Sequence, residues 1–294
     1  MPVPVRLGLA GAGRWGRNYL RTAARLEGVQ LASVASRNPD TAASVPPGCR
    51  VVGDWRELLD PSALDGLIIA TPPATHAEIA RAALAKGISV LIEKPLALSA
   101  GDAASILAAA RASAAHAWVE HTHLFSPSFR ALKELAARYG GVREIRGEAG
   151  NFGPYREDVP VLWDWGPHDV AMCLDLLGER PASAACTAIE RGENRQETIS
   201  VALSFPSGVP ASILLSNARE KVRRFSVRCA QATLLYDDLA ADKLTVDGRP
   251  VAVAAELPLA VAVREFAAAL AQPAKDYRSL ELGVAVVEVL AACE

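Results

Sequence analysis

Short apolar runs alternate with amphipathic stretches over the first 120 residues. The apolar runs predict buried strands at 5–10, 29–36, 50–52, 66–70, 88–93 and 116–121. The stretches between them carry apolar residues every three or four positions, which predicts helices at 17–28, 76–87 and 99–113, with shorter ones from Pro39 and at 55–59. Strands separated by helices of this length indicate a parallel, doubly wound sheet.

The pattern changes near residue 122. One more helix is predicted at 127–139, and strands then follow one another at 142–150, 182–190, 197–205, 209–216, 223–229, 232–237 and 243–247. Two helical patterns complete the chain from Pro258 onward. This order predicts an antiparallel or mixed sheet with helices on one face. We therefore expect one domain over residues 1–122 and a second over 123–294.

Composition and charge narrow the class of protein. The chain has 294 residues, of which 51% are apolar, and a formal net charge of −2, a length that suits two domains with a core each. Lys and Arg form no run, so nucleic acid is not expected as a partner. No apolar stretch reaches the roughly 18 uncharged residues of a membrane span, and the first residues lack the layout of a signal peptide.

The cysteines are five in number, widely spaced and without a CxxC pair. This usage indicates free thiols in a reducing cytoplasm, and neither a disulfide framework nor a zinc site. Cys173 falls in a helical stripe, where a thiol is usually core filler. We therefore expect a cytoplasmic protein that holds no metal ion.

A glycine-rich loop joins the first strand to the first helix. The segment GLAGAGRWGRN places Gly11, Gly13 and Gly16 in a GxGxxG pattern. The first glycine permits a tight turn, the second lets a pyrophosphate approach the backbone, and the third lets helix and strand pack closely. Free N–H groups at the helix start hold the phosphates. The loop predicts dinucleotide binding, with Arg14 and Trp15 beside the cofactor; the alternative is a glycine turn required only for packing.

The end of the second strand distinguishes NAD from NADP. An acid there would bind the ribose 2′-hydroxyl, but the strand ends Ala35-Ser36-Arg37. A guanidinium gives a 2′-phosphate a charge-assisted, bidentate contact. The sequence therefore favours NADP(H) over NAD(H), with Ser36 and Arg37 as contacts. The alternative for Arg37 is a solvated loop charge.

Two further loops follow strands, at the edge of an open α/β sheet where ligands bind. They read ATPPATH at 70–76 and IEKPLAL at 92–98. Lys94 follows an apolar strand and is fixed by a proline, which favours a functional amine over a solvated lysine at the loop mouth. A third segment, WDWGPHDV at 163–170, crowds apolar bulk and titratable groups together.

These motifs, GAGRWGRN, ATPPATH, IEKPLAL and WDWGPHDV in this order, resemble the Gfo/Idh/MocA family of nicotinamide-dependent sugar oxidoreductases. The resemblance covers essentially the whole chain. It implies an N-terminal Rossmann domain with a doubly wound parallel sheet, followed by an α+β domain with an open, mostly antiparallel sheet. It implies hydride transfer to or from a carbon of a sugar, a cyclitol or a nucleotide sugar, and a homodimer or homotetramer.

The resemblance also implies a catalytic set. The family's EKP lysine falls on Lys94, and its DxGxH stretch falls on Asp164, Gly166 and His168. Lys94, Asp164 and His168 are therefore the expected catalytic residues and contact the substrate. Many members carry a second acid three residues past the histidine, where this chain has Ala171, so the substrate contact usually made by that acid is not carried over.

Cofactor contacts are implied in the same way. Thr71, Pro72 and His76 match the family element that lines the cofactor side, and Glu93 matches a residue near the nicotinamide ribose. The bond between Lys94 and Pro95 is cis in many relatives.

The proton that leaves an alcohol with its hydride needs an acceptor, and a histidine fills this role at neutral pH. We expect Pro167 at the first position of a helix, which places His168 in the first turn. The positive helix end and Lys94 then disfavour imidazolium, so neutral His168 accepts the proton. Asp164 orients it or holds a substrate hydroxyl, and Lys94 polarises the alkoxide or shares the relay.

Several neighbours have two interpretations. Asp169 in that first turn is expected to support the helix rather than catalysis. Trp165, with Trp163, fits a packed wall as well as a sugar platform. Arg156 either binds an anionic sugar or phosphate, or pairs with Glu157 or Asp158 in its own loop.

His121 and His123 are expected to alternate on a strand, with one facing the cleft and neither ligating metal. A rival hypothesis for the whole chain is a non-catalytic NAD(P)-binding regulator of the same fold. The joint presence of Lys94, Asp164 and His168 favours the enzyme.

Overall fold

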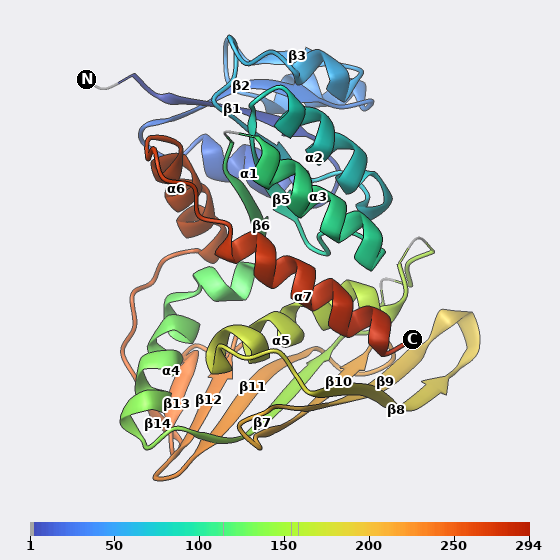
Figure 1. The fold of residues 1–294 in the computed structure, drawn as a ribbon, viewed down its shortest axis with the longest axis vertical. Helices are drawn as coiled ribbons and strands as arrows, with labels where there is room; N and C mark the ends of the chain where they lie inside the picture. Colours follow the sequence, from blue (N-terminus) through green and yellow to red (C-terminus); the bar gives the residue numbers. More distant parts are fainter. Residues whose placement is uncertain (1–2, 114, 154, 158) are drawn as a thin grey trace. The chain divides into compact units, whose positions relative to one another are not determined.

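The chain folds into two compact units in the computed structural model, which describes residues 3–113, 115–153, 155–157 and 159–294. The first unit comprises Met1–Glu120 and Leu257–Val287, and the second comprises His121–Glu256 and Glu288–Glu294 (Figure 1). The boundary predicted after residue 122 lies two residues beyond the observed one. The prediction that residues 257–287 belong to the second domain is wrong, because their apolar side chains complete the core of the first.

Six parallel strands form the sheet of the first unit, in the order β3-β2-β1-β4-β5-β6. The strands are β1 (Val5–Ala10), β2 (Val29–Ala35), β3 (Arg50–Val52), β4 (Gly66–Ile69), β5 (Ser89–Glu93) and β6 (Ala117–Glu120). Every residue of β4 and β5 is buried, as expected for strands covered on both faces. The predicted doubly wound parallel sheet is confirmed, and its topological switch lies between β1 and β4.

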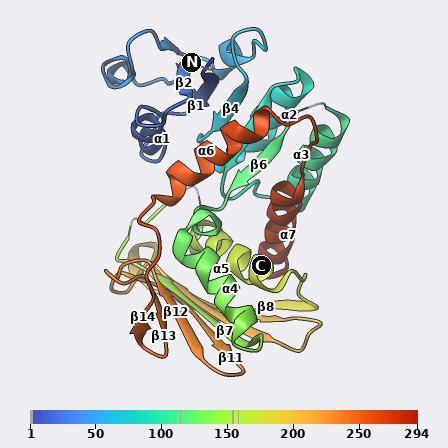
Figure 2. The ribbon, with the colours of Figure 1, turned by 90° about the vertical axis from the view of Figure 1, so that its left-hand side faces the viewer.

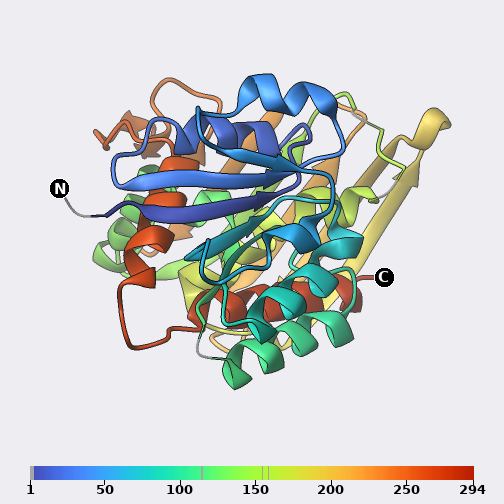
Figure 3. The ribbon, with the colours of Figure 1, turned by 90° about the horizontal axis from the view of Figure 1, so that it is seen from above.

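Helices cover both faces of this sheet. On one face α2 (His76–Ala85) and α3 (Ala100–Ala112) lie side by side, and α1 (Gly16–Ala23) packs beside α6 (Pro258–Leu270) on the other (Figure 3). The segments predicted as short helices are the 3₁₀ helices η1 (Pro39–Ser44) and η2 (Trp55–Leu58). A further 3₁₀ turn, η3 (Pro73–Thr75), precedes α2. Helix α1 ends earlier than predicted, because residues 24–26 turn away before Gly28, whose φ is 76°.

The core of the first unit joins the sheet to α1 and α6. Its members include Leu7, Leu9, Ile68, Tyr19, Leu20, Val263 and Phe266. The Phe266 ring is fully buried and stands edge-on to Trp118, with ring centroids 6.0 Å apart. A Cβ on Gly66 would lie 3.0 Å from this ring. Because α6 fills this space, the C-terminal segment is part of the sheet's hydrophobic core.

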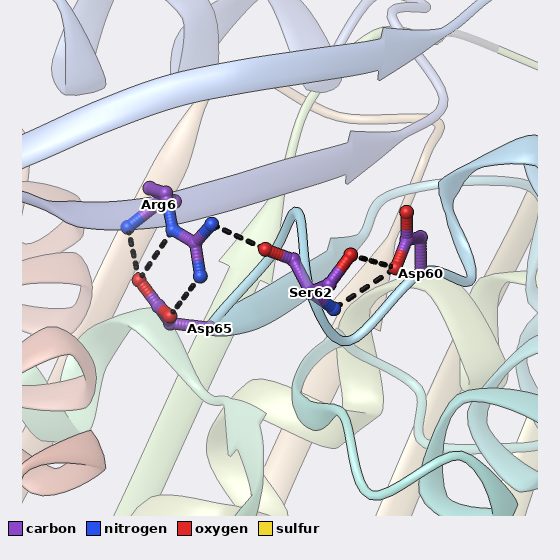
Figure 4. A network of polar contacts seen from close by, with 4 residues as sticks. All are labelled: Arg6, Asp60, Ser62 and Asp65. Atoms are coloured by element: carbon purple, nitrogen blue, oxygen red, sulfur yellow. Dashed lines mark hydrogen bonds and ion pairs between the residues drawn. The ribbon is translucent and has the colours of Figure 1, made fainter.

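A polar network braces the amino ends of β1 and β4 (Figure 4). The Arg6 guanidinium donates to the Asp65 carboxylate at 2.8 Å and to the Ser62 carbonyl at 2.6 Å. The backbone N–H and hydroxyl of Ser62 both donate to Asp60. The hydrogen bonds from Arg6 hold the pKa of Asp65 below its usual value. This end of the sheet is therefore fixed, while the opposite end carries the glycine loop.

Eight strands form the sheet of the second unit, in the order β14-β13-β12-β11-β7-β10-β9-β8. They are β7 (Val142–Gly150), β8 (Ser183–Arg191), β9 (Glu197–Ser204), β10 (Pro210–Ser216), β11 (Val222–Cys229), β12 (Thr233–Asp237), β13 (Leu244–Val246) and β14 (Arg249–Pro250). The β7–β10 pair is parallel and the other pairs are antiparallel, so the predicted open, mostly antiparallel sheet is confirmed. The strand β14 was not predicted.

Two helices cover one face of this sheet (Figure 2). The helix α4 (Pro127–Arg138) packs on β12 and β13, and α5 (Val161–Leu177) packs on β7, β9 and β10. The remaining elements of the chain are the 3₁₀ helices η4 (Thr122–Phe125) and η5 (Glu193–Arg195), and α7 (Arg278–Ala292), in which the boundary between the two units falls. Within the described residues, no helix combines the length and the apolarity needed to cross a membrane.

The start of α5 differs from the sequence prediction. We expected the helix to begin at Pro167, but it begins at Val161 after Pro160, and Pro167 lies inside it. Proline has no N–H for the carbonyl four residues earlier, which makes it unfavourable inside a helix. Burial of most of α5 against the sheet compensates, because tertiary packing supplies most helical stability in proteins. His168 is thus the eighth residue of the helix and not part of its first turn.

Candidate active site

The glycine loop after β1 has room for nothing larger than glycine at two positions. Gly11 has a φ of 94°, and a Cβ there would lie 2.7 Å from the backbone oxygen of Ala70. A Cβ on Gly16 would lie 2.1 Å from the backbone oxygen of Gly11. Both clashes are with backbone, which has no rotamer to change. Gly11 therefore permits the turn and Gly16 the close packing of α1 on β1, as the pattern predicts.

Gly13 has the opposite surroundings. No heavy atom lies within 4 Å of a Cβ placed on it, and the residue is exposed. A side chain here would fill only open space in front of the backbone. The loop is therefore open on the side where a pyrophosphate would approach N–H groups, and its residues fit a dinucleotide.

Trp15 and Tyr19 join the glycine loop and α1 to the end of β5. The indole N–H of Trp15 donates to the carboxylate of Glu93, and the Tyr19 hydroxyl donates to the same oxygen at 2.7 Å. Tyr19 is fully buried, whereas 43% of Trp15 is exposed. The spacing of the glycines does not reveal this link, because the partners lie more than 70 residues apart in the chain.

Glu93 is a buried acid at the start of the segment 92–98 that carries Lys94, here called the lysine loop. Burial raises its pKa to about 7, against the lowering effect of the Tyr19 hydrogen bond and the nearby Lys94. Its second oxygen accepts from the Lys94 backbone N–H at 3.2 Å. The Lys94–Pro95 peptide bond is cis, and the Lys94 side chain is half-buried. Glu93 therefore fixes the backbone that carries Lys94.

His76 connects the two loops that follow β4 and β5. Its Nδ1 lies 2.9 Å from the Pro95 carbonyl oxygen, and its Nε2 lies 2.9 Å from that of Thr71. The ring is fully buried, and this burial lowers its pKa. Both nitrogens thus face backbone carbonyls, and the single N–H of the neutral ring donates to one of them. His76 holds the loop of Thr71 and Pro72 beside the lysine loop.

The end of β2 carries the residues expected to select the cofactor. The Ser36 hydroxyl lies 2.7 Å from the Thr41 hydroxyl and accepts from the Asn38 N–H at 3.2 Å. Arg37 follows it and is exposed, and among the described residues no carboxylate pairs with it. Its guanidinium is therefore available to a solute at this edge of the sheet.

In the second unit, the first turns of α5 border a cavity of about 330 Å³. Asp164 and Trp165 line it, together with Arg156, Glu157, Val159, Pro160, Val161, Arg191, Gly192, Arg195, Gln196, Glu197 and Asn217. Arg156 donates to Asp164 at 3.2 Å. The predicted ion-pair partner Glu157 instead meets Arg195, and Asp158 lies outside the described residues. The structure thus brings three predicted substrate residues, Arg156, Asp164 and Trp165, to one cavity.

His168 lies on the following turn of α5 and is 9% exposed. Its ring meets that of His123 edge-on, with centroids 5.0 Å apart and planes at 81°. The strand predicted to carry His121 and His123 ends at Glu120, and His123 lies in the 3₁₀ helix η4. This turn carries His123 onto α5, a contact that strand alternation does not predict.

Asp169 has a different environment from the one expected. It lies within α5 and is fully buried, and burial raises its pKa to about 6 although Arg223 lowers it. Arg223 approaches it at 3.5 Å and also lies over the Trp165 ring, 5.2 Å from its centroid. The prediction that Asp169 stabilises a helix start is wrong, because the start lies eight residues earlier. Asp169 is instead the buried partner of Arg223.

The remaining aromatic and small residues of the motif serve packing. Trp163 is 3% exposed and its indole N–H donates to Glu294 at 2.6 Å, so it is a packed wall. A Cβ on Gly166 would lie 2.9 Å from Leu290, which makes this glycine a close-packing position and not a turn. Cys173 is fully buried in the core, as predicted.

Sequence reasoning missed three site residues. They are Tyr19, which donates to Glu93, Arg223, which pairs with Asp169, and Tyr236, whose hydroxyl lies 2.9 Å from His123 Nδ1. Each lies far along the chain from its partner and belongs to an ordinary helix or strand. The one sequence signal for these residues is a polar group at a position where the hydrophobic pattern predicts a core-facing side chain. Across the described part of the chain, no group of three or more His, Cys, Asp or Glu side chains is placed to hold a metal ion.

These features define the class of protein: a Rossmann unit with a loop open to a dinucleotide, followed by an α+β unit that carries titratable groups on a buried helix. Two family models match the chain, an oxidoreductase family with an NAD-binding Rossmann fold at residues 5–121 and a GFO/IDH/MocA C-terminal domain at residues 129–235. The chain belongs to the Gfo/Idh/MocA family of oxidoreductases.

Individual proteins agree with this membership. The crystal structure of a protein from Magnetospirillum magnetotacticum MS-1 is 47% identical, with a TM-score of 0.91 over 99% of this chain and 100% of that one. UDP-N-acetylglucosamine 3-dehydrogenase of Acidithiobacillus ferrooxidans is 27% identical over 76% of this chain and 71% of its own length. Inositol 2-dehydrogenase of Rhizobium meliloti is 28% identical over 86% of this chain and 76% of its own length.

Proposed function

We propose that the protein is an NADP(H)-dependent dehydrogenase or reductase that acts on a carbon bearing a hydroxyl or carbonyl group in a sugar, a cyclitol or a nucleotide sugar. The observation that carries the proposal is the joint presence of Lys94 after β5 and of Asp164 and His168 on α5. A regulator that only binds the dinucleotide needs the glycine loop but none of these side chains. Similar proteins named above act on UDP-N-acetylglucosamine and on inositol, which supports this range of substrates.

The first unit would hold the cofactor. The open backbone at Gly13 and the N–H groups at the start of α1 suit the pyrophosphate, with Arg14 and the exposed part of Trp15 beside it. Thr71 and Pro72 lie on the loop that follows β4. When bound, the nicotinamide accepts or donates the hydride.

Lys94 would stabilise the charge of the reacting hydroxyl, and His168 would transfer its proton. The Lys94 ammonium stabilises the alkoxide as it develops. Neutral His168 accepts the proton in oxidation and returns it in reduction. The sequence predicts that the positive end of a helix keeps the His168 imidazole neutral. This reason does not apply, because His168 lies in the middle of α5. Asp164 then holds a substrate hydroxyl, one helical turn before His168.

The cavity beside Asp164 would accept the part of the substrate that does not react. Its three arginines all face carboxylates, with Arg156 on Asp164 at 3.2 Å, Arg191 on Glu197 at 3.2 Å and Arg195 on Glu157 at 3.3 Å. Donors and acceptors are therefore balanced, and no excess positive charge awaits an anion. Paired donors and acceptors beside the face of Trp165 suit the hydroxyls and the apolar face of a sugar ring.

Replacement of Lys94 tests the catalytic assignment. Lys94→Ala should reduce turnover by about 100-fold or more, because one preorganised charge on a developing oxyanion contributes on this scale. NADPH affinity, measured by cofactor fluorescence, should stay within a few-fold of the wild type. Lys86→Ala, an exposed lysine at the end of α2, is the matched control. Near-normal turnover of Lys94→Ala would exclude this role.

The same assay separates the enzyme from the regulator. Wild-type protein is incubated with NADP⁺ or NADPH and a panel of sugars, cyclitols and nucleotide sugars. The enzyme should change nicotinamide absorbance with at least one of them. If bound cofactor never changes oxidation state, the regulator hypothesis replaces the present one.

Replacement of Arg37 tests the preference for NADP(H). Arg37→Ala should weaken NADPH by about 10-fold or more, since a charge-assisted hydrogen bond contributes about 1.5–3 kcal/mol. NADH affinity should change little, because NADH has no 2′-phosphate. Arg25→Ala, exposed beyond the end of α1, is the control. Equal losses for both cofactors, or none, would show that Arg37 does not contact the 2′-phosphate.

A further inference from the structure

A chain of polar side chains in the second unit leads from His168 toward solvent. The His123 ring stands edge-on to the His168 ring at 5.0 Å. On its other side, the His123 Nδ1 lies 2.9 Å from the Tyr236 hydroxyl, which lies 3.2 Å from Asp238. Lys243 donates to the same Asp238 oxygen at 2.7 Å. Four elements, α5, η4, β12 and the turn after β12, contribute to this chain.

The direction of these hydrogen bonds follows from the chemistry of their groups. Asp238 next to Lys243 has a lowered pKa, so it is a carboxylate and can only accept. The single hydroxyl proton of Tyr236 therefore goes to Asp238. Tyr236 must then accept from His123, which places the proton of neutral His123 on Nδ1 and leaves Nε2 as the acceptor nitrogen.

We infer that His123 is a positioning residue for His168, fixed as the Nδ1–H tautomer by Tyr236 and Asp238 so that its ring holds the His168 ring in one orientation. The inference rests on the proposed proton-handling role of His168. It concerns how that ring is held.

The position of Tyr236 favours support of a functional ring over simple packing. The side chain is 1% exposed and its ring lies 6.5 Å from that of Phe129, among apolar neighbours. A phenylalanine would fill this core without a polar group to satisfy. A buried hydroxyl is stable only when hydrogen-bonded. Its partners here are His123, which contacts His168, the Asp238 carboxylate and the Ser126 side chain.

Charged groups near His168 come from its own helix and from the sheet below. Asp164 lies one turn earlier, Asp169 is the next residue, and Arg223 of β11 pairs with Asp169. His123 of η4 faces the ring itself. The Tyr236 hydroxyl hydrogen-bonds His123, and the charge of Arg223 also acts on it. A change in the pH profile of Tyr236→Phe therefore reports on the His123–His168 pair when the His123 tautomer changes with it.

Nitrogen-15 NMR of the histidine rings in the full chain tests the tautomer directly and does not depend on activity. The protein has five histidines, so the His123 signals are assigned by loss in His123→Asn. Wild-type His123 should show a protonated Nδ1 and an unprotonated Nε2, and Tyr236→Phe should move the proton to Nε2 in a large fraction of molecules. Tyr277→Phe, which removes a hydroxyl bonded to the Ala110 carbonyl in the first unit, should leave His123 unchanged.

A second experiment measures the kinetics of the variants with a substrate found in the panel of sugars, cyclitols and nucleotide sugars. Tyr236→Phe should lower kcat/KM by roughly 10- to 100-fold, the scale expected when a reacting group is slightly misplaced, and should shift the pH profile, while NADPH affinity remains. His123→Asn, whose amide can still donate to Tyr236, should retain more activity than His123→Ala. An Nε2–H tautomer in wild type, or a Tyr236→Phe variant with unchanged tautomer and pH profile, would overturn the inference.

The two proposals fail separately in these experiments. If His168→Ala turns over normally, the proposed role of His168 is wrong whatever the tautomer of His123. If His168→Ala is inactive but Tyr236→Phe matches the wild type in both experiments, the role of His168 stands and His123 is a core residue only.

Discussion

Individual residues in this protein acquire properties that their type does not predict. Asp169 illustrates this, because an acid beside a candidate catalytic histidine suggests helix support or catalysis. In the structure it is buried under Gly147, where a Cβ would lie 2.6 Å from its Oδ1. Among the described residues this oxygen has no hydrogen-bond partner. Within the part of the chain that the structure describes, its ionic partner is Arg223, at 3.5 Å.

This environment predicts a pH-dependent stability. The pKa of Asp169 is about 6 in the folded protein, against 3.8 as its ordinary value. The folded state therefore binds the proton more tightly than the unfolded chain, and stability falls as pH rises from about 4 to about 6. A shift of this size corresponds to about 3 kcal/mol. Asp169→Asn should lack this decline.

Urea unfolding at pH 4 and pH 7 measures the effect. The free energy of unfolding of Asp169→Asn relative to wild type should increase by a few kcal/mol between the two pH values. At pH 4 the wild-type Asp169 carboxyl is itself protonated and forms no ion pair with Arg223, so the prediction concerns the difference between the two pH values. Exposed Asp242→Asn should show no such change. Parallel pH curves for Asp169→Asn and wild type would contradict the prediction.

The candidate catalytic residues are easier to identify from the sequence than the residues that surround them. Lys94, Asp164 and His168 stand in local motifs, which one can read along the chain. Glu93 with Tyr19, and His123 with Tyr236, are pairs separated by 74 and 113 positions. No local pattern encodes such a pair, because the contact exists only once the elements have packed.

At the scale of elements, the glycine loop follows its pattern closely. Its spacing predicts three different functions for three glycines, and the space around each Cβ position agrees: backbone clashes at Gly11 and Gly16, and open space at Gly13. The local chain geometry decides these features. Such an element is therefore predictable from sequence alone.

Gly13→Ala separates cofactor approach from folding. The added methyl meets no protein atom, so the melting temperature should stay the same or rise slightly, as for alanine at a compatible site. NADPH affinity, measured by fluorescence titration, should fall by about 10-fold or more, because the methyl occupies the path of the pyrophosphate. Gly53→Ala, also in open space, is the control and should alter neither. Unchanged NADPH affinity in Gly13→Ala would exclude close approach of the cofactor at this point.

Helix α5 is the element whose predicted start was wrong. Pro167 and Gly166 suggest a helix start, because proline favours a first helical position. The helix instead runs through both residues, since Val161, Leu162 and Trp163 are buried and form its first turn. Gly166 allows Leu290 to approach. Packing overrides the local preference here, and the override moves His168 from a helix end to a buried interior position.

At the scale of the whole molecule, the chain returns to its first unit after completing the second sheet. Residues 257–287 carry α6 and most of α7, and they belong with the Rossmann sheet. Periodicity predicts that these helices exist and are amphipathic. It contains no information on which of two sheets their apolar faces cover, because both sheets present apolar surfaces.

Phe266 tests this arrangement in the full chain. The side chain is fully buried against Trp118 and Gly66, so Phe266→Ala should cost about 3–5 kcal/mol of stability. Because the loss falls in the Rossmann core, bound NADPH should raise the melting temperature of the variant. Phe152→Ala, whose side chain is 62% exposed, should change stability by less than about 0.5 kcal/mol. A similarly small loss for Phe266→Ala would show that α6 does not complete this core.

The sequence by itself determined the two sheets, the order of their strands along the chain, the glycine loop and the residue types of the candidate catalytic set. These depend on periodicity and on contacts between near neighbours, which the order of residues encodes directly. Tertiary structure alone decided the start of α5, the unit to which α6 belongs, the burial of Asp169 and the contacts that link His168, His123 and Tyr236. Each of these depends on which apolar face is buried against which partner, and that free energy exists only after distant segments meet.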